Sequence, residues 1–209
     1  MGDAEEFVYV VDDDPSVRRG LTRLLRSAAH TVEAFSSATD FLGRERCEGV
    51  GCLVLDVRMP GLDGMELQAE LAARGVDLPI VFLTGHGDIP MAVQAIKKGA
   101  VDFLTKPVDE EVLLNTVHEA LQRHASCRAE LRAAEAVRER LRLLTSRELE
   151  VLRCVITGAR NKRIAAHLGI SEQTVKIHRA RVMTKLEMKT WTALFQACQR
   201  AGIEPSTGL

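Results

Sequence analysis

The first 108 residues alternate short apolar segments with longer segments of helical periodicity, and this alternation constrains the fold more than any other feature. The short segments are rich in β-branched and aromatic residues, which favour strands. Strands that alternate with helices form a parallel sheet with helices on both faces, so we expect an α/β domain with five parallel strands. The expected strands are Phe7–Val11, Thr31–Phe35, Cys52–Leu55, Ile80–Leu83 and Asp102–Leu104.

After this region the sequence predicts helices only. A helical pattern runs from Asp109 toward Leu141, and residues 122–143 contain neither glycine nor proline, so we expect a helical connector. Four residues of the connector follow one another at spacings of three, four and three positions and form one stripe along the helix. This spacing is compatible with a short coiled-coil seam or with a solvated helix that bears one weak apolar stripe. The stripe consists of Leu131, Ala134, Arg138 and Leu141.

The C-terminal segment carries the start and stop signals of four short helices. Thr145 and Glu148 have the spacing of a capping box ahead of the first helix. Two helices, over Asn161–Leu168 and Glu172–Leu186, flank a turn that contains Gly169 and predict a helix-turn-helix. A fourth helix is expected to start at Thr190 or Thr192 and to end near Gly202. The expected division is an α/β domain over 1–122, a helical linker over 123–143 and an all-α domain over 144–209.

Charge is distributed unevenly between these parts. The formal net charge is −1, but residues 1–122 hold 21 acids and 11 bases, whereas residues 123–209 hold 8 acids and 17 bases. The longest stretches without a charged residue are ten residues long, well below the roughly 18–20 that span a membrane. The five cysteines form no CxxC pair. We therefore expect no membrane span, reduced thiols and a cytoplasmic protein.

Polar residues follow four of the expected strands and should gather at one edge of the sheet. Asp12 and Asp13 follow the first strand, Asp56 the third, Thr84 the fourth and Lys106 the fifth. Clustered carboxylates suit Mg²⁺, or Mn²⁺, because these hard cations prefer oxygen ligands. A cation beside Asp56 would neutralise an incoming phosphoryl group, so the carboxylate would be able to act as a nucleophile. Lys106 and the Thr84 hydroxyl would hold the phosphoryl oxygens.

These residues lie in motifs that resemble the receiver domain of bacterial two-component response regulators, over residues 7 to about 121. The resemblance implies a flavodoxin-like fold and a phosphoacceptor, Asp56, that takes its phosphoryl group from a sensor histidine kinase. The matching stretches are Val10–Asp13, Leu55–Gly61, Leu83–Asp88 and Phe103–Pro107.

The resemblance also assigns further roles at this edge. It implies that Asp13, Asp56 and the backbone carbonyl of Arg58 hold Mg²⁺, with Asp12 acting through water. Phe103 stands at the position of the family's switch aromatic, which turns inward as Thr84 moves toward the phosphate. Plain core packing is the alternative interpretation of Phe103.

The expected third C-terminal helix carries four bases and one acid, which favours binding to double-stranded DNA in the major groove. A solvated charged face is the alternative. The segment over about 143–205 is similar to LuxR-type DNA-binding domains. By resemblance the positions that face bases are Lys176, Ile177 and Ala180, and those that approach the DNA backbone are Asn161, Lys162, Thr174, His178, Arg181 and Lys185.

Together the two halves resemble the FixJ/NarL class, with a pattern closest to its FixJ and StyR branch. The resemblance implies a phosphorylation-dependent transcription regulator that dimerises when phosphorylated and acts on promoter DNA and RNA polymerase. One alternative is a phosphotransfer or protein-interaction module whose basic half does not bind DNA. A metal phosphatase is disfavoured because its general acid would fall at Arg58, and arginine does not release a proton near neutral pH. We therefore expect a regulator and not an enzyme.

Overall fold

The computed structural model describes residues 6–44, 49–85 and 89–207. Cys47 and the last three residues of the matching stretch Leu83–Asp88 lie outside the described residues. The chain divides into two compact units, residues 1–128 and 129–209, which are called the N-terminal and C-terminal units below. The described cysteines are all free thiols. Among the described residues, the helices are too short or too polar to cross a membrane.

The N-terminal unit contains a five-stranded parallel sheet in the order β2-β1-β3-β4-β5. This confirms the expected sheet, and each strand lies within two residues of its predicted bounds. Three strands extend farther than expected toward the edge that carries the polar residues. The strands are β1 Glu6–Val11, β2 Thr31–Phe35, β3 Val50–Asp56, β4 Ile80–Thr84 and β5 Asp102–Thr105.

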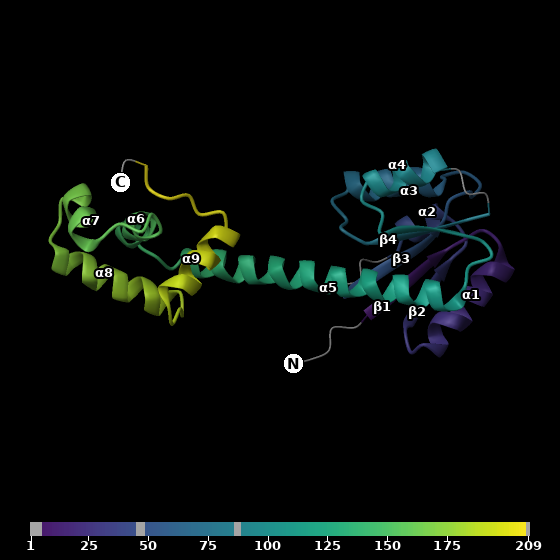
Figure 1. Cartoon of the computed structure of the whole chain (residues 1–209), viewed down its shortest axis with the longest axis horizontal. Coiled ribbons are helices and arrows are strands. Elements are labelled where there is room, and N and C mark those ends of the chain that lie inside the picture. Colours follow the sequence, from purple (N-terminus) through teal and green to yellow (C-terminus); the bar gives the residue numbers. More distant parts are fainter. Residues whose placement is uncertain (1–5, 45–48, 86–88, 208–209) are drawn as a thin grey trace. The chain divides into compact units, whose positions relative to one another are not determined.

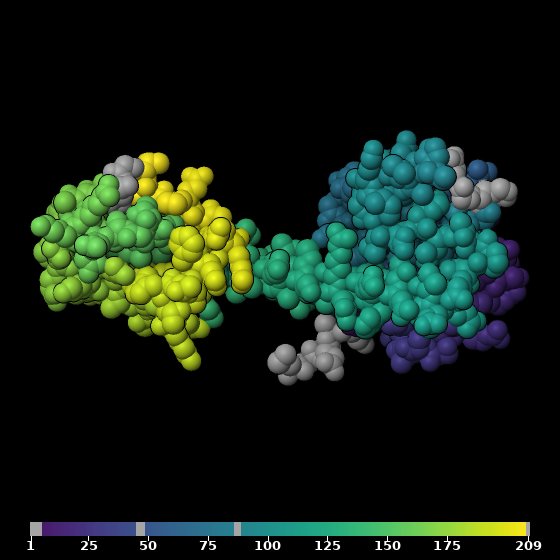
Figure 2. All heavy atoms as spheres, in the orientation of Figure 1, coloured from purple at the N-terminus to yellow at the C-terminus, as the bar shows by residue number. Residues whose placement is uncertain are grey.

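Helices cover both faces of the sheet (Figure 1). On one face α1 (Pro15–Ser27) and α5 (Glu110–Leu141) pack against β1 and β3, and Figure 2 shows α5 forming much of the surface of this unit that faces the viewer. On the other face lie α2 (Ala38–Leu42), α3 (Gly64–Ala73) and α4 (Ile89–Lys97). The short helix α2 was not predicted, because five residues give too little helical periodicity.

The C-terminal unit is all-helical, as the capping signals predict. Its helices are α6 Ser146–Val155, α7 Asn161–Leu168, α8 Glu172–Lys185 and α9 Trp191–Arg200. The capping box of α6 is complete, with Thr145 and Glu148 each accepting a hydrogen bond from the other's backbone N–H. Between α7 and α8 the chain turns at Gly169, whose φ of 65° is favourable for glycine, and Ser171 caps α8.

The last part of α5 belongs to the core of the C-terminal unit. Val137 is 7% exposed and packs against Ala197 and Ala201 at the end of α9, while Leu131 is 53% exposed. Arg138 Nε donates a hydrogen bond to the Ala201 carbonyl at 3.4 Å. Part of the apolar side of α5 therefore packs inside the C-terminal unit. Neither the coiled-coil seam nor the solvated helix, the two interpretations of the stripe, predicts this arrangement.

Candidate functional site

The strand ends of the N-terminal unit gather the predicted acids around one lysine. Lys106 Nζ lies 2.6 Å from Asp12 Oδ2 and 3.1 Å from Asp56 Oδ2. The strand register explains why Asp12 and Asp56 are neighbours, because Val11 of β1 pairs with Leu55 of β3 and each acid follows one member of this pair. Asp12 is 1% exposed and Asp56 is 8% exposed.

The turn between β1 and α1 is held by hydrogen bonds that sequence reasoning did not anticipate. The Asp14 N–H donates to Asp12 Oδ1 at 2.9 Å, and Asp14 Oδ1 caps α1 by accepting from Ser16 N–H at 2.7 Å. Arg18 Nη1 donates to the Asp12 carbonyl at 2.6 Å. These contacts fix the Asp12 carboxylate and leave the exposed Asp13 beside it.

The loop after β3 passes close to the start of α3 at Gly64. Gly64 N–H donates to the Val57 carbonyl at 2.9 Å. A Cβ at Gly64 would lie 2.4 Å from the backbone oxygen of Asp56, so only glycine allows this approach. Sequence reasoning missed this residue. A glycine directly after the N-cap Asp63 was the available signal, because glycine costs stability in a helix relative to residues with a side chain.

Burial and charge act in opposite directions on the acids and the lysine. Burial raises the pKa of Asp56, and the ammonium of Lys106 offsets part of this rise. Burial alone would lower the pKa of Lys106, but its hydrogen bond to Asp12 and the charges of Asp12 and Asp56 outweigh burial and raise it. The lysine therefore stays charged and holds two carboxylates that would otherwise repel each other.

The same three acids have the composition of a hard-cation site. One carboxylate oxygen from each of Asp12, Asp13 and Asp56 can be chosen so that all lie within 4.8 Å of one another. Oxygen donors with this charge fit Mg²⁺ or Mn²⁺. The backbone carbonyl of Arg58, the fourth expected ligand, remains a prediction.

Thr84 and Phe103 occupy the neighbouring strands β4 and β5. Thr84 is 1% exposed, and its carbonyl accepts a hydrogen bond from Lys106 N–H at 2.7 Å, which ties the two strand ends together. The peptide bond between Lys106 and Pro107 is cis. The Phe103 ring is partly buried, 6.0 Å from the Phe82 ring between centroids. Phe103 thus packs on the core, and its switch role stays a prediction.

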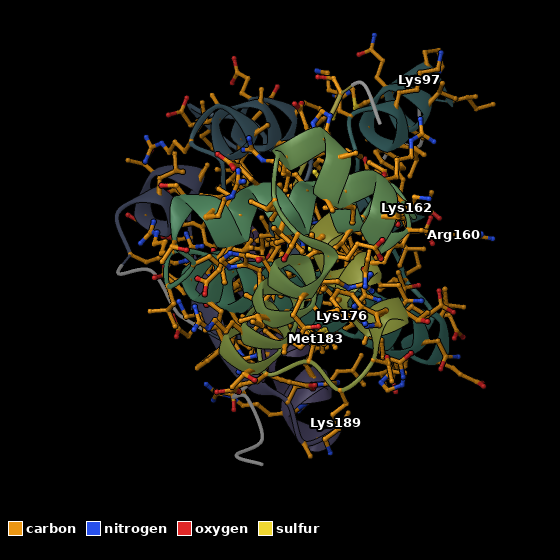
Figure 3. The ribbon with its side chains drawn as sticks, turned by 90° about the vertical axis from the view of Figure 1, so that its left-hand side faces the viewer. Lys97, Arg160, Lys162, Lys176, Met183 and Lys189 are labelled. Carbon is orange, nitrogen blue, oxygen red and sulfur yellow. The ribbon has the colours of Figure 1, made fainter. Side chains whose placement is uncertain are left out.

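In the C-terminal unit, α8 buries Val175 and Val182 and exposes the three positions expected to face bases, Lys176, Ile177 and Ala180. Arg181 is exposed as well, and so is Lys162 on α7. Figure 3 shows Lys162 and Arg160 near each other at one edge of the view. The helix therefore presents an accessible basic and apolar surface.

Two other residues of the expected DNA-binding set are engaged within the unit. Lys185 Nζ lies 2.6 Å from Glu148 Oε2 and donates to the Leu143 carbonyl at 3.0 Å. This ion pair and the Thr145 N–H lower the pKa of the buried Glu148 to about 2. Asn161 Oδ1 accepts a hydrogen bond from Arg179 Nη1 at 2.6 Å. Sequence reasoning missed the structural contacts of Glu148 with Lys185 and of Arg179 with Asn161, because both join different helices.

The remaining two residues of the set lie on the first half of α8. Thr174 is partly buried, and its Oγ1 shares a hydrogen bond with Ser171 Oγ at 2.8 Å. His178 is also partly buried, and its Nδ1 is buried without a hydrogen-bond partner in the described part of the chain. Any contact of His178 with DNA would therefore use Nε2.

Each of the two units matches a known protein family. Residues 8–118 match the response regulator receiver domain, and residues 142–197 match the luxR family of bacterial regulatory proteins. The chain is a two-component response regulator with a LuxR-type output domain. Its receiver is the N-terminal unit, and its DNA-binding domain lies in the C-terminal unit. This response regulator is a transcriptional regulator of a two-component system, as are its relatives.

Relatives of this response regulator match it over almost its whole length. It is 43% identical to the transcriptional regulatory protein FixJ of Azorhizobium caulinodans over 95% of this chain and 94% of FixJ. It is 45% identical to nodulation protein W of Bradyrhizobium diazoefficiens over 94% of this chain and 86% of that protein. Among solved structures, StyR matches at 47% identity with a TM-score of 0.82, covering 94% of this chain and 100% of that chain.

Proposed function

We propose that this regulator binds promoter DNA under the control of phosphorylation at Asp56, with the phosphoryl group supplied by a sensor histidine kinase. The observation that supports this most is Lys106, which bridges the buried Asp12 and Asp56 at the strand ends. A fixed ammonium 3.1 Å from the Asp56 carboxylate stands where negative charge would increase on phosphorylation.

The acidic cluster is proposed to hold Mg²⁺ or Mn²⁺ through Asp12, Asp13, Asp56 and the Arg58 carbonyl. When bound, the cation would offset the negative charge of the carboxylates and of the phosphoryl group. The Asp56 carboxylate is the nucleophile, and the Lys106 ammonium pairs with a phosphoryl oxygen.

The response to phosphorylation is proposed to pass through Thr84 and Phe103. The Thr84 hydroxyl at the end of β4 would donate to a phosphoryl oxygen, and Phe103 would move inward behind it. The exposed apolar face of α4 supports dimerisation of the receiver, because Ile89 is 77% exposed and both Val93 and Ile96 are nearly half exposed.

For the output domain we propose that α8 enters the major groove of promoter DNA. Lys176, Ile177 and Ala180 would face the bases. Five residues would approach the phosphates: Asn161, Lys162, Thr174, His178 and Arg181. Lys185 is not included, because its ammonium is bound to Glu148. A dimer would place two output domains on half-sites about one helical turn apart, near RNA polymerase, in the cytoplasm.

Labelling by a small phosphodonor tests the phosphoacceptor. Asp56→Asn should abolish the base-labile acyl phosphate that forms on the wild type in the presence of Mg²⁺. Asp14→Asn is the matched control, because it removes the same charge nearby and an asparagine oxygen still caps α1. Undiminished labelling of Asp56→Asn, or equal loss in both variants, would contradict the assignment.

A further inference from the structure

Arg179 lies on α8 among residues expected to bind DNA, yet its side chain joins three helices. Its Nη1 donates to Asn161 Oδ1, the first residue of α7, at 2.6 Å. Its guanidinium carbon lies 4.1 Å from the centroid of the Trp191 ring at the start of α9. Arg179 thereby connects α8 to both α7 and α9.

The surroundings of Arg179 differ from those of the accessible bases on the same helix. Lys176 and Arg181 are exposed, whereas Arg179 is partly buried, and this burial lowers the pKa of its guanidinium. Guanidinium stacking on an aromatic ring combined with a hydrogen bond from its edge fixes the plane of the group. Arg179 is therefore held inside the domain and does not present a free cation to a phosphate.

The contact with Arg179 decides which end of the Asn161 amide is turned away from the guanidinium. An asparagine amide has an acceptor end and a donor end of nearly equal shape, so its orientation depends on its partners. Because Arg179 takes the oxygen, the NH₂ group is turned away from it. Lys162 and Arg160 flank Asn161 and lie near each other in Figure 3, which places this amide in a basic neighbourhood.

A phosphate oxygen accepts hydrogen bonds, so it needs the NH₂ end of the amide. If the amide were rotated by half a turn, its oxygen would face the phosphate and repel it. We infer that Arg179 is a positioning residue for DNA binding, which orients the Asn161 amide as a phosphate donor while its stacking on Trp191 fixes the guanidinium. This inference rests on the proposed DNA contact of Asn161.

A double-mutant cycle on the full-length phosphorylated protein tests the inference. Affinity for a random-sequence duplex is measured for the wild type, Asn161→Ala, Arg179→Met and the double variant over a range of salt concentrations. Each single change should weaken binding about five-fold, and the double variant should bind about as well as Arg179→Met alone. The slope of log affinity against log salt should be unchanged in Arg179→Met, since no phosphate contact of a cation is lost.

Two results would overturn the inference. Effects of the two changes that multiply in the double variant would show that Arg179 and Asn161 act independently. A slope reduced by about one in Arg179→Met would show that Arg179 itself contacts a phosphate. Arg179→Lys replaces the methionine variant in the cycle if the latter does not fold, because lysine keeps the cation but loses the planar fork. The double variant with Asn161→Ala should again bind about as well as the Arg179 variant alone.

Lys176→Ala separates a failure of this inference from a failure of the proposed function. If wild-type protein binds duplex DNA and Lys176→Ala weakens binding to selected sites, the proposed function stands whatever the cycle shows. If the phosphorylated wild type does not bind DNA at all, the proposed function fails and the inference fails with it. Additive effects with intact DNA binding overturn the role of Arg179 alone.

Discussion

Replacing Lys185 by methionine should lower the stability of the output domain rather than weaken its contact with DNA. The substitution removes the ammonium that lies 2.6 Å from Glu148 Oε2, while the Glu148 carboxylate stays buried with its side chain 3% exposed. The shift of the Glu148 pKa to about 2 corresponds to about 3 kcal/mol at roughly 1.4 kcal/mol per unit. Thr145 contributes part of this shift and water screens the partly exposed Lys185, so we expect the variant to lose about 1–2 kcal/mol.

The pH dependence of this loss has a defined sign. Because the pKa of Glu148 is lowered in the folded state, its contribution to the free energy of unfolding is complete above its ordinary pKa. The contribution is lost as pH falls from that ordinary value toward about 2, the folded-state pKa. The difference in stability between wild type and Lys185→Met should therefore be largest near neutral pH and shrink in acid.

Thermal unfolding of the full-length protein at neutral and acidic pH measures this difference for the output transition. A loss of 1–2 kcal/mol in a domain of this size lowers Tm by about 5–10 °C. Lys189→Met, which removes an exposed lysine near the end of α8, is the matched control and should change Tm little. A loss below about 0.5 kcal/mol in Lys185→Met would refute the reasoning. A slope of log DNA affinity against log salt reduced by about one would refute it as well, and would assign Lys185 to a phosphate.

Two further predictions concern the receiver. Gly64→Ala should lower receiver stability by more than about 2 kcal/mol and abolish labelling, because its Cβ would lie 2.4 Å from the Asp56 carbonyl. Gly20 lies in α1, and a Cβ there would meet no other atom, so Gly20→Ala should instead stabilise the receiver by up to about 1 kcal/mol. Equal chemical-denaturation midpoints for the two variants would contradict the close packing at Gly64. Mg²⁺ should raise the Tm of the receiver, chelation should reverse this, and Asp13→Asn should weaken the effect. An unchanged response in Asp13→Asn would exclude that carboxylate as a ligand.

The sheet and the strand-end cluster were predictable because each depends on local pattern. Apolar runs fix the strands, and the carboxyl ends of parallel strands meet at one edge, so Asp12 and Asp56 lie close because β1 and β3 are adjacent. Lys106 follows β5, two strands away from β3, and its long side chain reaches both acids. The capping box at Thr145 and the turn at Gly169 are equally local signals.

Contacts between helices were not predictable in the same way. The resemblance placed Lys185 near DNA, but whether its ammonium faces outward depends on where α6 places Glu148. Helical spacing did not show that Val137 packs on α9, because the spacing gives a face and not its partner. The close approach at Gly64 likewise depends on a loop whose path no periodicity describes.

The most direct test of the central claim is the affinity of the full-length protein for a selected promoter duplex with and without a small phosphodonor and Mg²⁺. Phosphorylation should tighten binding of the wild type, and Asp56→Asn should bind with the same weaker affinity under both conditions. Equal affinity of the wild type with and without a verified acyl phosphate, or a phosphodonor response that persists in Asp56→Asn, would contradict control of DNA binding through Asp56.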